Sequence, residues 1–274
     1  MPEQHRRGFS LVELLVVIAV VALLVSVLLP ALGAARRQGQ LLQSVSNVRQ
    51  ITTAALAYAY DNSDTWPIWP VSINESRGWV RFNSWDAFGA TTSEYWDGTS
   101  SERTAAEAPL NEYIYADLDL DDPSEDERLE LPIFECPGDR ATFQRAFWST
   151  GVPDYELTGY DDVGTSYHQN VMWWYASAEA GERETERWAR TKRMFRRAMF
   201  RKSSTFVWLY DQKFDIIAIK GDTLDGDHGG TNKATAAFMD GHCGYINVQP
   251  GEAYTDEYQL LFEPPKGPVE IPGD

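Results

Sequence analysis

The chain has 274 residues and a formal net charge of −17 at pH 7, from 24 lysines and arginines against 41 aspartates and glutamates. We do not expect it to bind nucleic acid, because phosphate groups need a concentrated cationic surface. Its only two cysteines, Cys136 and Cys243, exclude a disulfide-rich scaffold. They could form one long-range disulfide or remain free as small core residues. The length is enough for one domain with a substantial core.

The chain begins with a short polar leader, residues 1–8, followed by an almost unbroken apolar run over residues 9–29. As a helix, this run would rise about 31 Å, which matches the hydrocarbon thickness of a bilayer. Its one carboxylate, Glu13, would cost about 2 to 3 kcal/mol at membrane depth and therefore needs a partner. An ordinary secretory signal peptide is disfavoured, because no small-x-small cleavage pattern follows a short apolar core.

The apolar run starts after Gly8 with Phe9, and Glu13 is the fifth residue counted from Phe9. This pattern resembles the bacterial type IV prepilins and type II secretion pseudopilins. The resemblance implies that a prepilin peptidase cuts after Gly8, that Phe9 becomes the N-methylated first residue, and that Glu13 pairs with an N-terminal amine during assembly. Pro30 stands where this class commonly has a helix-kinking proline.

The same resemblance implies a location and a set of partners. The protein would be a single-pass protein of the bacterial inner membrane with a periplasmic globular domain, and it would enter a filament after assembly. Its partners would be the prepilin peptidase, membrane lipid, and other pilin or pseudopilin subunits contacted through the N-terminal helix. Charge does not decide the orientation, since Arg36 and Arg37 after the span match Arg6 and Arg7 before it.

The helical pattern continues beyond the apolar run to residue 60 and becomes amphipathic, with apolar residues mostly three or four positions apart. We expect a rod of about 75 Å whose second half packs on a globular domain. The residues expected to be buried there are Leu42, Val45, Val48, Ile51 and Leu56. The predicted divisions are the leader (1–8), the transmembrane and assembly helix (9–29), its amphipathic continuation (30–60) and the globular domain (61–274).

Several short motifs follow. They occupy residues 46–51 (Ser-Asn-Val-Arg-Gln-Ile), 134–139 (Phe-Glu-Cys-Pro-Gly-Asp), 166–170 (Ser-Tyr-His-Gln-Asn), 227–230 (Asp-His-Gly-Gly) and 238–242 (Phe-Met-Asp-Gly-His). Together they resemble a subgroup of prepilin-like proteins abundant in planctomycetes and related bacteria, with a His-x-Gly to Asp-Gly-His pattern near the C-terminus. Their physical content is mostly turns, because Pro-Gly and Asp-Gly are strong turn dipeptides.

The region after residue 65 is rich in tryptophan, and residues 117–127 are rich in carboxylates. The tryptophans are Trp66, Trp69, Trp79, Trp85, Trp96 and Trp148. Indole rings could form a sugar-binding surface, but burial in the core is the favoured interpretation. The acidic segment lacks the glycine and ligand spacing of an EF-hand loop, so it predicts a solvated surface loop.

Apolar segments in the C-terminal part predict the strands of an antiparallel sheet. They are residues 205–210, 215–220, 234–239 and 243–248. The Asp240-Gly241 dipeptide between the last two favours a hairpin. With the N-terminal helix, these segments predict an α+β fold in which a long helix packs on an antiparallel sheet, as the resemblance to pilins also implies.

One group of residues around this hairpin has side chains suited to metal binding or catalysis. It comprises His228, Asp240 and His242, with Asp225 and Asp227 adjacent and His168 as a further candidate. Such side chains could bind a metal ion, and for the hard oxygen donors Asp225, Asp227 and Asp240 the expected ion is calcium. A structural corner without a cofactor is the favoured interpretation, because metal-ligand spacing of the zinc-enzyme type is absent.

Residues 183–202 hold nine basic residues and two acidic ones, interleaved with aromatic and methionine side chains. In an acidic protein this segment is a polarised patch. It could dock on an anionic surface, either lipid headgroups or the acidic face of a neighbouring subunit. A solvated helix face neutralised by the protein's own carboxylates fits the sequence equally well.

The predicted function is that of a structural subunit of a type IV pilus or type II secretion pseudopilus. No nucleophile elbow, phosphate loop, HExxH or GxGxxG motif occurs in the sequence, so we do not expect an enzyme. One alternative is a membrane-tethered periplasmic enzyme with a metal site near His228, Asp240 and His242. Another is a minor pilin or lectin that binds polysaccharide through its tryptophans.

Overall fold

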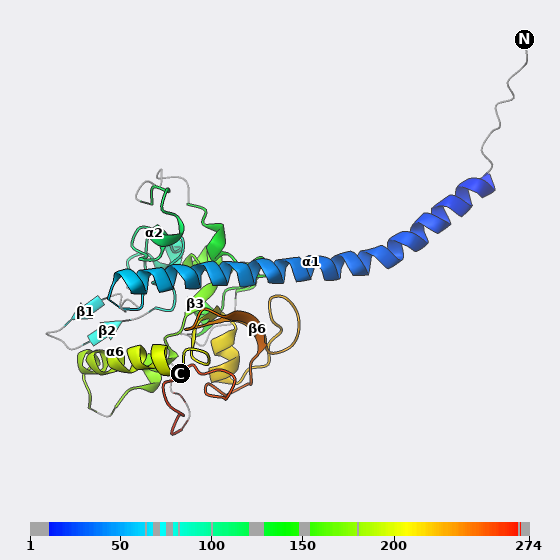
Figure 1. Ribbon diagram of the computed structural model, residues 1–274. Coiled ribbons are helices and arrows are strands. Elements are labelled where there is room, and N and C mark those ends of the chain that lie inside the picture. The colour runs from blue at the N-terminus through cyan, green and yellow to red at the C-terminus, as the bar shows by residue number, and fades with distance from the viewer. Residues whose placement is uncertain are drawn as a thin grey trace, which may run out of the picture. The chain divides into compact units, whose positions relative to one another are not determined.

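The computed structural model describes residues 11–63, 65–67, 72–74, 79–81, 83–99, 101–120, 129–147, 154–179, 181–267 and 269 (Figure 1). The chain forms two compact units, Met1–Gly39 and Gln40–Asp274. Helix α1 (Leu11–Asp61) runs through this division, and all other elements belong to the second unit. These are β1 (Ser72–Asn74), β2 (Trp79–Arg81), η1 (Glu94–Trp96), α2 (Asn111–Ile114), η2 (Pro132–Phe134), α3 (Gln144–Phe147), α4 (Gly159–Val163), β3 (Tyr167–Gln169), α5 (Met172–Ala176), α6 (Glu184–Arg201), β4 (Val207–Asp211), η3 (Ile216–Lys220), β5 (Lys233–Phe238) and β6 (Cys243–Asn247).

Helix α1 has 51 residues and includes Pro30. It ends where the polar residues after Tyr60 predict a stop: the Asn62 backbone and side-chain amides both donate to the Tyr58 carbonyl oxygen, each at 2.9 Å. Ser63 follows in the left-handed conformation with φ 55°, which terminates helices. The predicted helix is therefore confirmed, and it is long and apolar enough to cross a membrane.

The central sheet has four antiparallel strands in the order β3-β4-β5-β6, so the predicted α+β fold class is confirmed and the fold is consistent with a pilin-like one. Strands β4, β5 and β6 lie within two residues of three predicted strands. The fourth prediction, residues 215–220, is wrong, because Ile216–Lys220 forms the π-helix η3. A short apolar run is ambiguous between strand and buried helix, and here the helix is formed. Strand β3 was not predicted.

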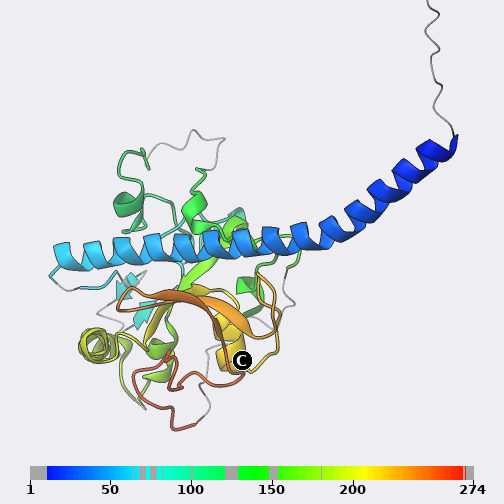
Figure 2. The same ribbon diagram turned by 45° about the vertical axis from the view of Figure 1, so that its right-hand side comes forward.

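Both faces of the sheet are covered, and successive side chains of a strand point to opposite faces. On one face, Tyr167 of β3 contacts Ser44 of α1, with 3.0 Å between the two hydroxyl oxygens. On the other face, the His168 ring lies 6.2 Å from that of Trp85, and Tyr210 stacks on Phe214 at 5.2 Å. Figure 2 shows the C-terminal half of α1 (light blue) running alongside the sheet.

The face of α1 that packs on the sheet differs from the predicted one. The buried residues are Ser44, Asn47, Val48, Ile51, Thr52, Ala54, Ala55, Tyr58 and Ala59. Burial of Val48 and Ile51 is confirmed, but Leu42 and Leu56 are 64% and 40% exposed, so their predicted burial is wrong. Both leucines lie about 120° to 160° around the helix axis from Ser44. Small residues face the sheet instead and allow the helix to approach it closely.

The tryptophans whose side chains are described belong mainly to the core. Trp66 and Trp85 are 4% and 1% exposed. Trp66 packs edge-to-face on Trp208 at 5.1 Å, and the half-buried Trp96 donates from its indole nitrogen to Asp162 at 2.9 Å. Core burial is thus confirmed for Trp66 and Trp85. Trp69, Trp148 and the side chain of Trp79 lie outside the described residues.

Candidate functional site

The first candidate site is the N-terminal part of α1. Gly8 and Phe9 lie outside the described residues. Glu13 occupies the first turn of α1, where the helix dipole favours a negative charge. The large apolar residues described between Leu11 and Leu32 are all exposed, from 44% at Val25 to 76% at Leu11. A patch of this size is not stable against water, so this segment needs lipid or other apolar helices around it.

The second candidate is a polar cluster formed by Cys136, Asp139, Ser166, Asp227 and His228. Ser166 Oγ donates to Asp139 Oδ2 at 2.6 Å and accepts from the Cys136 backbone amide at 3.0 Å. Cys136 Sγ lies 3.4 Å from His228 Nε2. Three of the short sequence motifs, far apart along the chain, therefore meet at one place.

Helix α1 joins this polar cluster through the motif at residues 46–51 and the turn before it. Ser44 Oγ lies 3.6 Å from Cys136 Sγ. Asn47 donates from its side-chain amide to the Glu135 carbonyl oxygen at 3.0 Å, and Gln40 donates in the same way to the Pro137 carbonyl oxygen at 3.0 Å. The two amide bonds give hydrogen-bond partners to partly buried backbone carbonyls of residues 135 and 137.

The close packing of two segments leaves no room for a side chain at Gly138. A Cβ atom at this position would lie 2.6 Å from the Asp227 carbonyl oxygen and 2.9 Å from His228 Cε1. Real Cβ atoms do not approach backbone that closely, so the absence of a side chain lets residues 136–139 contact the Asp227-His228 segment.

The electrostatics of the polar cluster are dominated by burial. Loss of water raises the pKa of Asp139 to about 7, and the nearby Asp227 adds to this effect. Burial and Asp227 also raise the pKa of Asp211. Lys213 neutralises part of this negative charge, with its Nζ 2.6 Å from Asp227 Oδ1. Burial alone would lower the pKa of Lys213, but the attraction of Asp227 outweighs it and the pKa is raised.

The Cys136–His228 pair is not set up as a nucleophile. Burial and the charge of Asp227 raise the pKa of the Cys136 thiol, and burial lowers the pKa of His228. A neutral thiol beside a neutral imidazole lacks the thiolate that attacks a substrate. Cys136 is also only 1% exposed. The chemistry of the polar cluster is therefore hydrogen bonding that joins α1 to three loops.

The predicted calcium ligands are not brought together. Asp227 pairs with Lys213, and Asp225 accepts from Thr231 Oγ1 at 3.1 Å, before β5 begins. Asp240 lies in the turn at the other end of β5, where its Oδ1 is 2.6 Å from His242 Nδ1. The length of β5 separates the two places, about 20 Å for six residues. No group of three or more His, Cys, Asp or Glu suited to a metal occurs within the described ranges.

The histidines named with these carboxylates also lie apart. His242 stacks on Phe238 at 3.9 Å and, with Asp240, fixes the hairpin turn, in which Gly241 has φ 92°. His168 is fully buried on β3, with its Nδ1 3.2 Å from Gln144 Nε2, and burial lowers its pKa to about 3. His228 belongs to the polar cluster. The predicted enzyme constellation is thus spread over three environments.

Both cysteines are free thiols in the structure, which corresponds to the second of the two alternatives. Cys136 lies beside Ser44, whereas Cys243 makes a hydrogen bond with Thr52. Ser44 and Thr52 are eight residues apart on α1, about 12 Å along its axis. A disulfide requires Cα atoms within about 7 Å, so the two thiols cannot meet without moving the sheet.

Sequence reasoning missed several members of this region. Asp211, Gln212 and Lys213 form a polar run at the end of β4, between two apolar segments, and this position was the available signal. Gln212 donates to Asp139 Oδ1 at 3.1 Å and accepts from the Phe143 backbone amide at 3.1 Å. Ser44 gives no signal of its own, because a serine on an amphipathic helix is ordinarily exposed.

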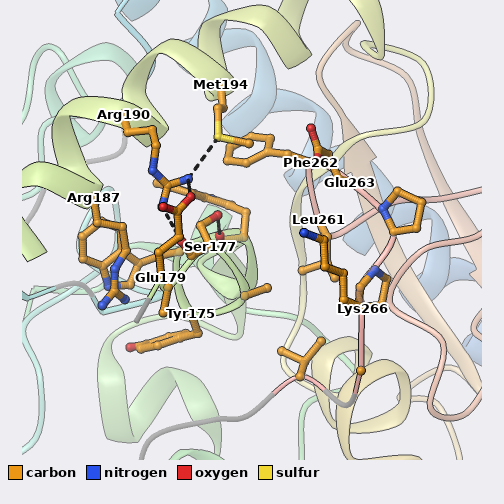
Figure 3. A pocket seen from close by; sticks show the side chains of 18 of the residues that line it. Tyr175, Ser177, Glu179, Arg187, Arg190, Met194, Leu261, Phe262, Glu263 and Lys266 are labelled. Carbon is orange, nitrogen blue, oxygen red and sulfur yellow. Dashed lines mark hydrogen bonds and ion pairs between the residues drawn. The ribbon is translucent and has the colours of Figure 1, made fainter. Parts of the chain in front are cut away.

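The basic segment forms α6. On its buried side, Phe195 packs against Trp173 and Phe262 of the aromatic core. Figure 3 shows a pocket of about 790 Å³ between α5, α6 and residues 261–267. Two of the cations that line it already have contacts: Arg190 Nη2 lies 2.7 Å from Glu182 Oε2, and the Arg187 guanidinium lies over the Trp174 ring at 4.6 Å.

Comparison with known proteins bears on the N-terminal segment. Residues 4–29, 26 of the 274, match the family described as the prokaryotic N-terminal methylation motif. This match supports a type IV prepilin- or pseudopilin-like protein, as Gly8, Phe9 and Glu13 predicted. It points to a structural pilin-type protein, processed by a peptidase and assembling with other pilin subunits, and with the apolar helix it fits a membrane-anchored protein. No curated protein and no solved structure matches the chain.

Proposed function

We propose that the chain is a structural subunit of a type IV pilus or type II secretion pseudopilus. A single pass of α1 anchors it in the bacterial inner membrane with the globular domain in the periplasm, and it enters a filament after a prepilin peptidase removes residues 1–8. The observation that carries the proposal is the row of exposed apolar side chains from Leu11 to Leu32, which adjoins Glu13 and overlaps the matched motif.

The proposal assigns no catalysis and no cofactor to the globular domain. The polar cluster supports a structural role, because its bonds tie α1 to the loops of the domain. Its motifs lie beyond residue 29, outside the matched segment, and their membership in the planctomycete-type subgroup is part of the proposal. The lectin alternative gains no support, since Trp66 and Trp85 are buried.

Processing gives the first prediction. In cells with an active prepilin peptidase, the protein extracted from membranes should begin at Phe9 and carry one additional methyl group. Intact-mass analysis of the membrane fraction measures both features, and cells without the peptidase provide the control with residues 1–8 retained. An unprocessed chain in peptidase-containing cells would contradict the proposal.

The second prediction concerns Glu13. Glu13→Ala should leave membrane insertion intact, because it removes a charge that costs about 2 to 3 kcal/mol in lipid. Incorporation into filaments should be lost, because the carboxylate no longer pairs with an N-terminal amine of another subunit. Leu14→Ala is the matched control and should retain incorporation. Quantifying membrane and sheared-filament fractions compares the variants, and equal incorporation of Glu13→Ala and wild type would refute the pairing.

A further inference from the structure

Helix α6 presents a face that its own domain does not use. The exposed residues of its C-terminal two-thirds include five cations, named here the cationic face: Lys192, Arg193, Arg196, Arg197 and Arg201. At 100° per residue they occupy one half of the helix surface, and the 70% exposed Phe200 lies in the middle of them. The opposite half, with Thr191, Phe195 and Ala198, is buried.

The cationic face destabilises α6 rather than supporting it. Lys192 and Arg196, Arg193 and Arg197, and Arg197 and Arg201 are like charges four residues apart, an arrangement that opposes helix formation. The helix dipole favours cations only in the last turn, so it does not explain Lys192, Arg193 or Arg196.

Among the residues that the structure describes, carboxylates of the same domain do not compensate for this arrangement. None of the five cations forms an ion pair with another residue in the described part of the chain; Lys192 lies over the Trp188 ring at 5.1 Å. The interpretation that the domain neutralises this face itself therefore finds no support among the described residues. The partner that such a face would attract is an anionic one.

The complementary surface is present on the chain itself. Residues 183–202 contain nine of the 24 cations and two of the 41 carboxylates, which leaves 15 cations against 39 carboxylates elsewhere. Near α2, Asp117, Leu118 and Asp119 are all exposed. They repeat the pattern of the cationic face with opposite sign, since Leu118 is an exposed apolar side chain between two carboxylates, just as Phe200 lies between arginines.

We propose that the cationic face of α6 docks on the Asp117–Asp119 surface of a second copy of this chain. Two different surfaces meet in such a contact, so it is heterologous, and repeating it produces an open chain of subunits. The inference rests on the proposed function, because it adds a contact between globular domains to an assembly that α1 begins.

A neighbouring subunit fits this face better than a lipid surface. Phe195 of α6 packs on Trp66 at 6.5 Å, just after the C-terminal end of α1. Within the unit Gln40–Asp274, the part of α1 from residue 40 to residue 61 is about 32 Å long, and the apolar run precedes it in the sequence. Charges interact over about 8 to 10 Å at physiological salt.

The test uses the full-length chain in membranes with a photo-crosslinking amino acid in place of Phe200. Ultraviolet light should produce a crosslinked dimer whose mapped partner peptide contains Asp117 to Asp119, and high salt should suppress it. Arg193→Glu/Arg197→Glu should reduce the yield about tenfold, and so should Asp117→Arg/Asp119→Arg. Combining all four changes in one chain should restore part of the yield, because the substituted charges on the two surfaces are then again opposite in sign.

The control is Arg140→Glu/Lys266→Glu, which changes the net charge equally at exposed cations outside α6 and should leave the yield unchanged. Equal yields from wild type and Arg193→Glu/Arg197→Glu, or no restoration in the fourfold variant, would overturn the inference. Crosslinking to lipid instead of protein would also overturn it and assign the face to the membrane. Loss of processing at Phe9 with the crosslink retained would reject the proposed function alone.

Discussion

At the scale of single residues, Asp215 is a buried carboxyl group, and ionising it as the pH rises should cost folding stability. Its Oδ2 accepts from the Tyr210 hydroxyl at 3.3 Å, whereas Oδ1 has no hydrogen-bond partner among the described residues. Burial raises the pKa of Asp215 from 3.8 to about 7. The same cause raises the pKa of Asp86 to about 7. Between about pH 4 and 7, the folded chain therefore keeps protons on Asp215 and Asp86 that the unfolded chain has released.

The free energy of unfolding should fall as the pH rises from 6.5 to 8. A group with a raised pKa stabilises the fold below its unfolded value of 3.8, and this contribution is lost as the pH passes about 7. The buried histidines have lowered pKa values and act in the opposite direction, but only below 6.5. Urea unfolding in detergent, followed by tryptophan fluorescence, measures the decrease.

Asp215→Asn should remove about 1 kcal/mol of this decrease, because asparagine does not titrate. Asp222→Asn, at an exposed position, is the control and should reproduce the wild-type slope. The same slope in Asp215→Asn and wild type would show that Asp215 does not carry the effect.

At the scale of elements, α1 packs through one narrow face, and its fully buried side chains should determine stability. Ile51→Ala leaves a cavity against the sheet and should lower the free energy of unfolding by about 2 to 5 kcal/mol. Leu42→Ala, on the exposed side of the same helix, should change it by less than about 0.5 kcal/mol. Chemical denaturation of the two variants makes the comparison. Equal effects would mean that the face of α1 is assigned wrongly.

Helices and strands were predicted correctly where the local sequence pattern was strong. The long apolar periodicity gave α1, and Asp240-Gly241 between apolar segments gave the β5–β6 hairpin. The prediction of residues 215–220 as a strand is wrong, because the π-helix buries Ile216 and Ile217 as well as a strand would. The buried face of α1 could not be predicted, because small residues such as Ser44 and Ala55 carry no hydrophobic signal and are buried only through their contact with the sheet.

Of the two candidate sites, one could be predicted from the sequence and the other could not. The assembly segment could be recognised from Gly8, Phe9 and Glu13, because that signal is contiguous in sequence. The polar cluster could not, because its contacts join residues about ninety positions apart, such as Cys136 with Ser44 and with His228. Its motifs were visible, but only the packing of α1 shows that they meet.

At the scale of the whole molecule, the boundary between the two compact units predicts where the chain can be shortened. A chain of residues 40–274 keeps Val48 and Ile51 and loses the exposed apolar residues from Leu11 to Leu32, so it should be soluble and folded. A chain of residues 62–274 lacks the helix that covers the sheet and should aggregate. Size-exclusion chromatography and thermal melting compare the two, and equal behaviour would show that α1 is dispensable for the core.

Helix α1 holds the apolar assembly segment and part of the domain's core on one continuous backbone. A pulling force that arrives along α1 therefore reaches the domain through the contacts of Val48 and Ile51 and the bonds of Ser44 and Asn47. The domain could release that load only by losing the helix that completes its core. The force that the join between α1 and the domain can bear is thus set by the folding stability of the domain itself.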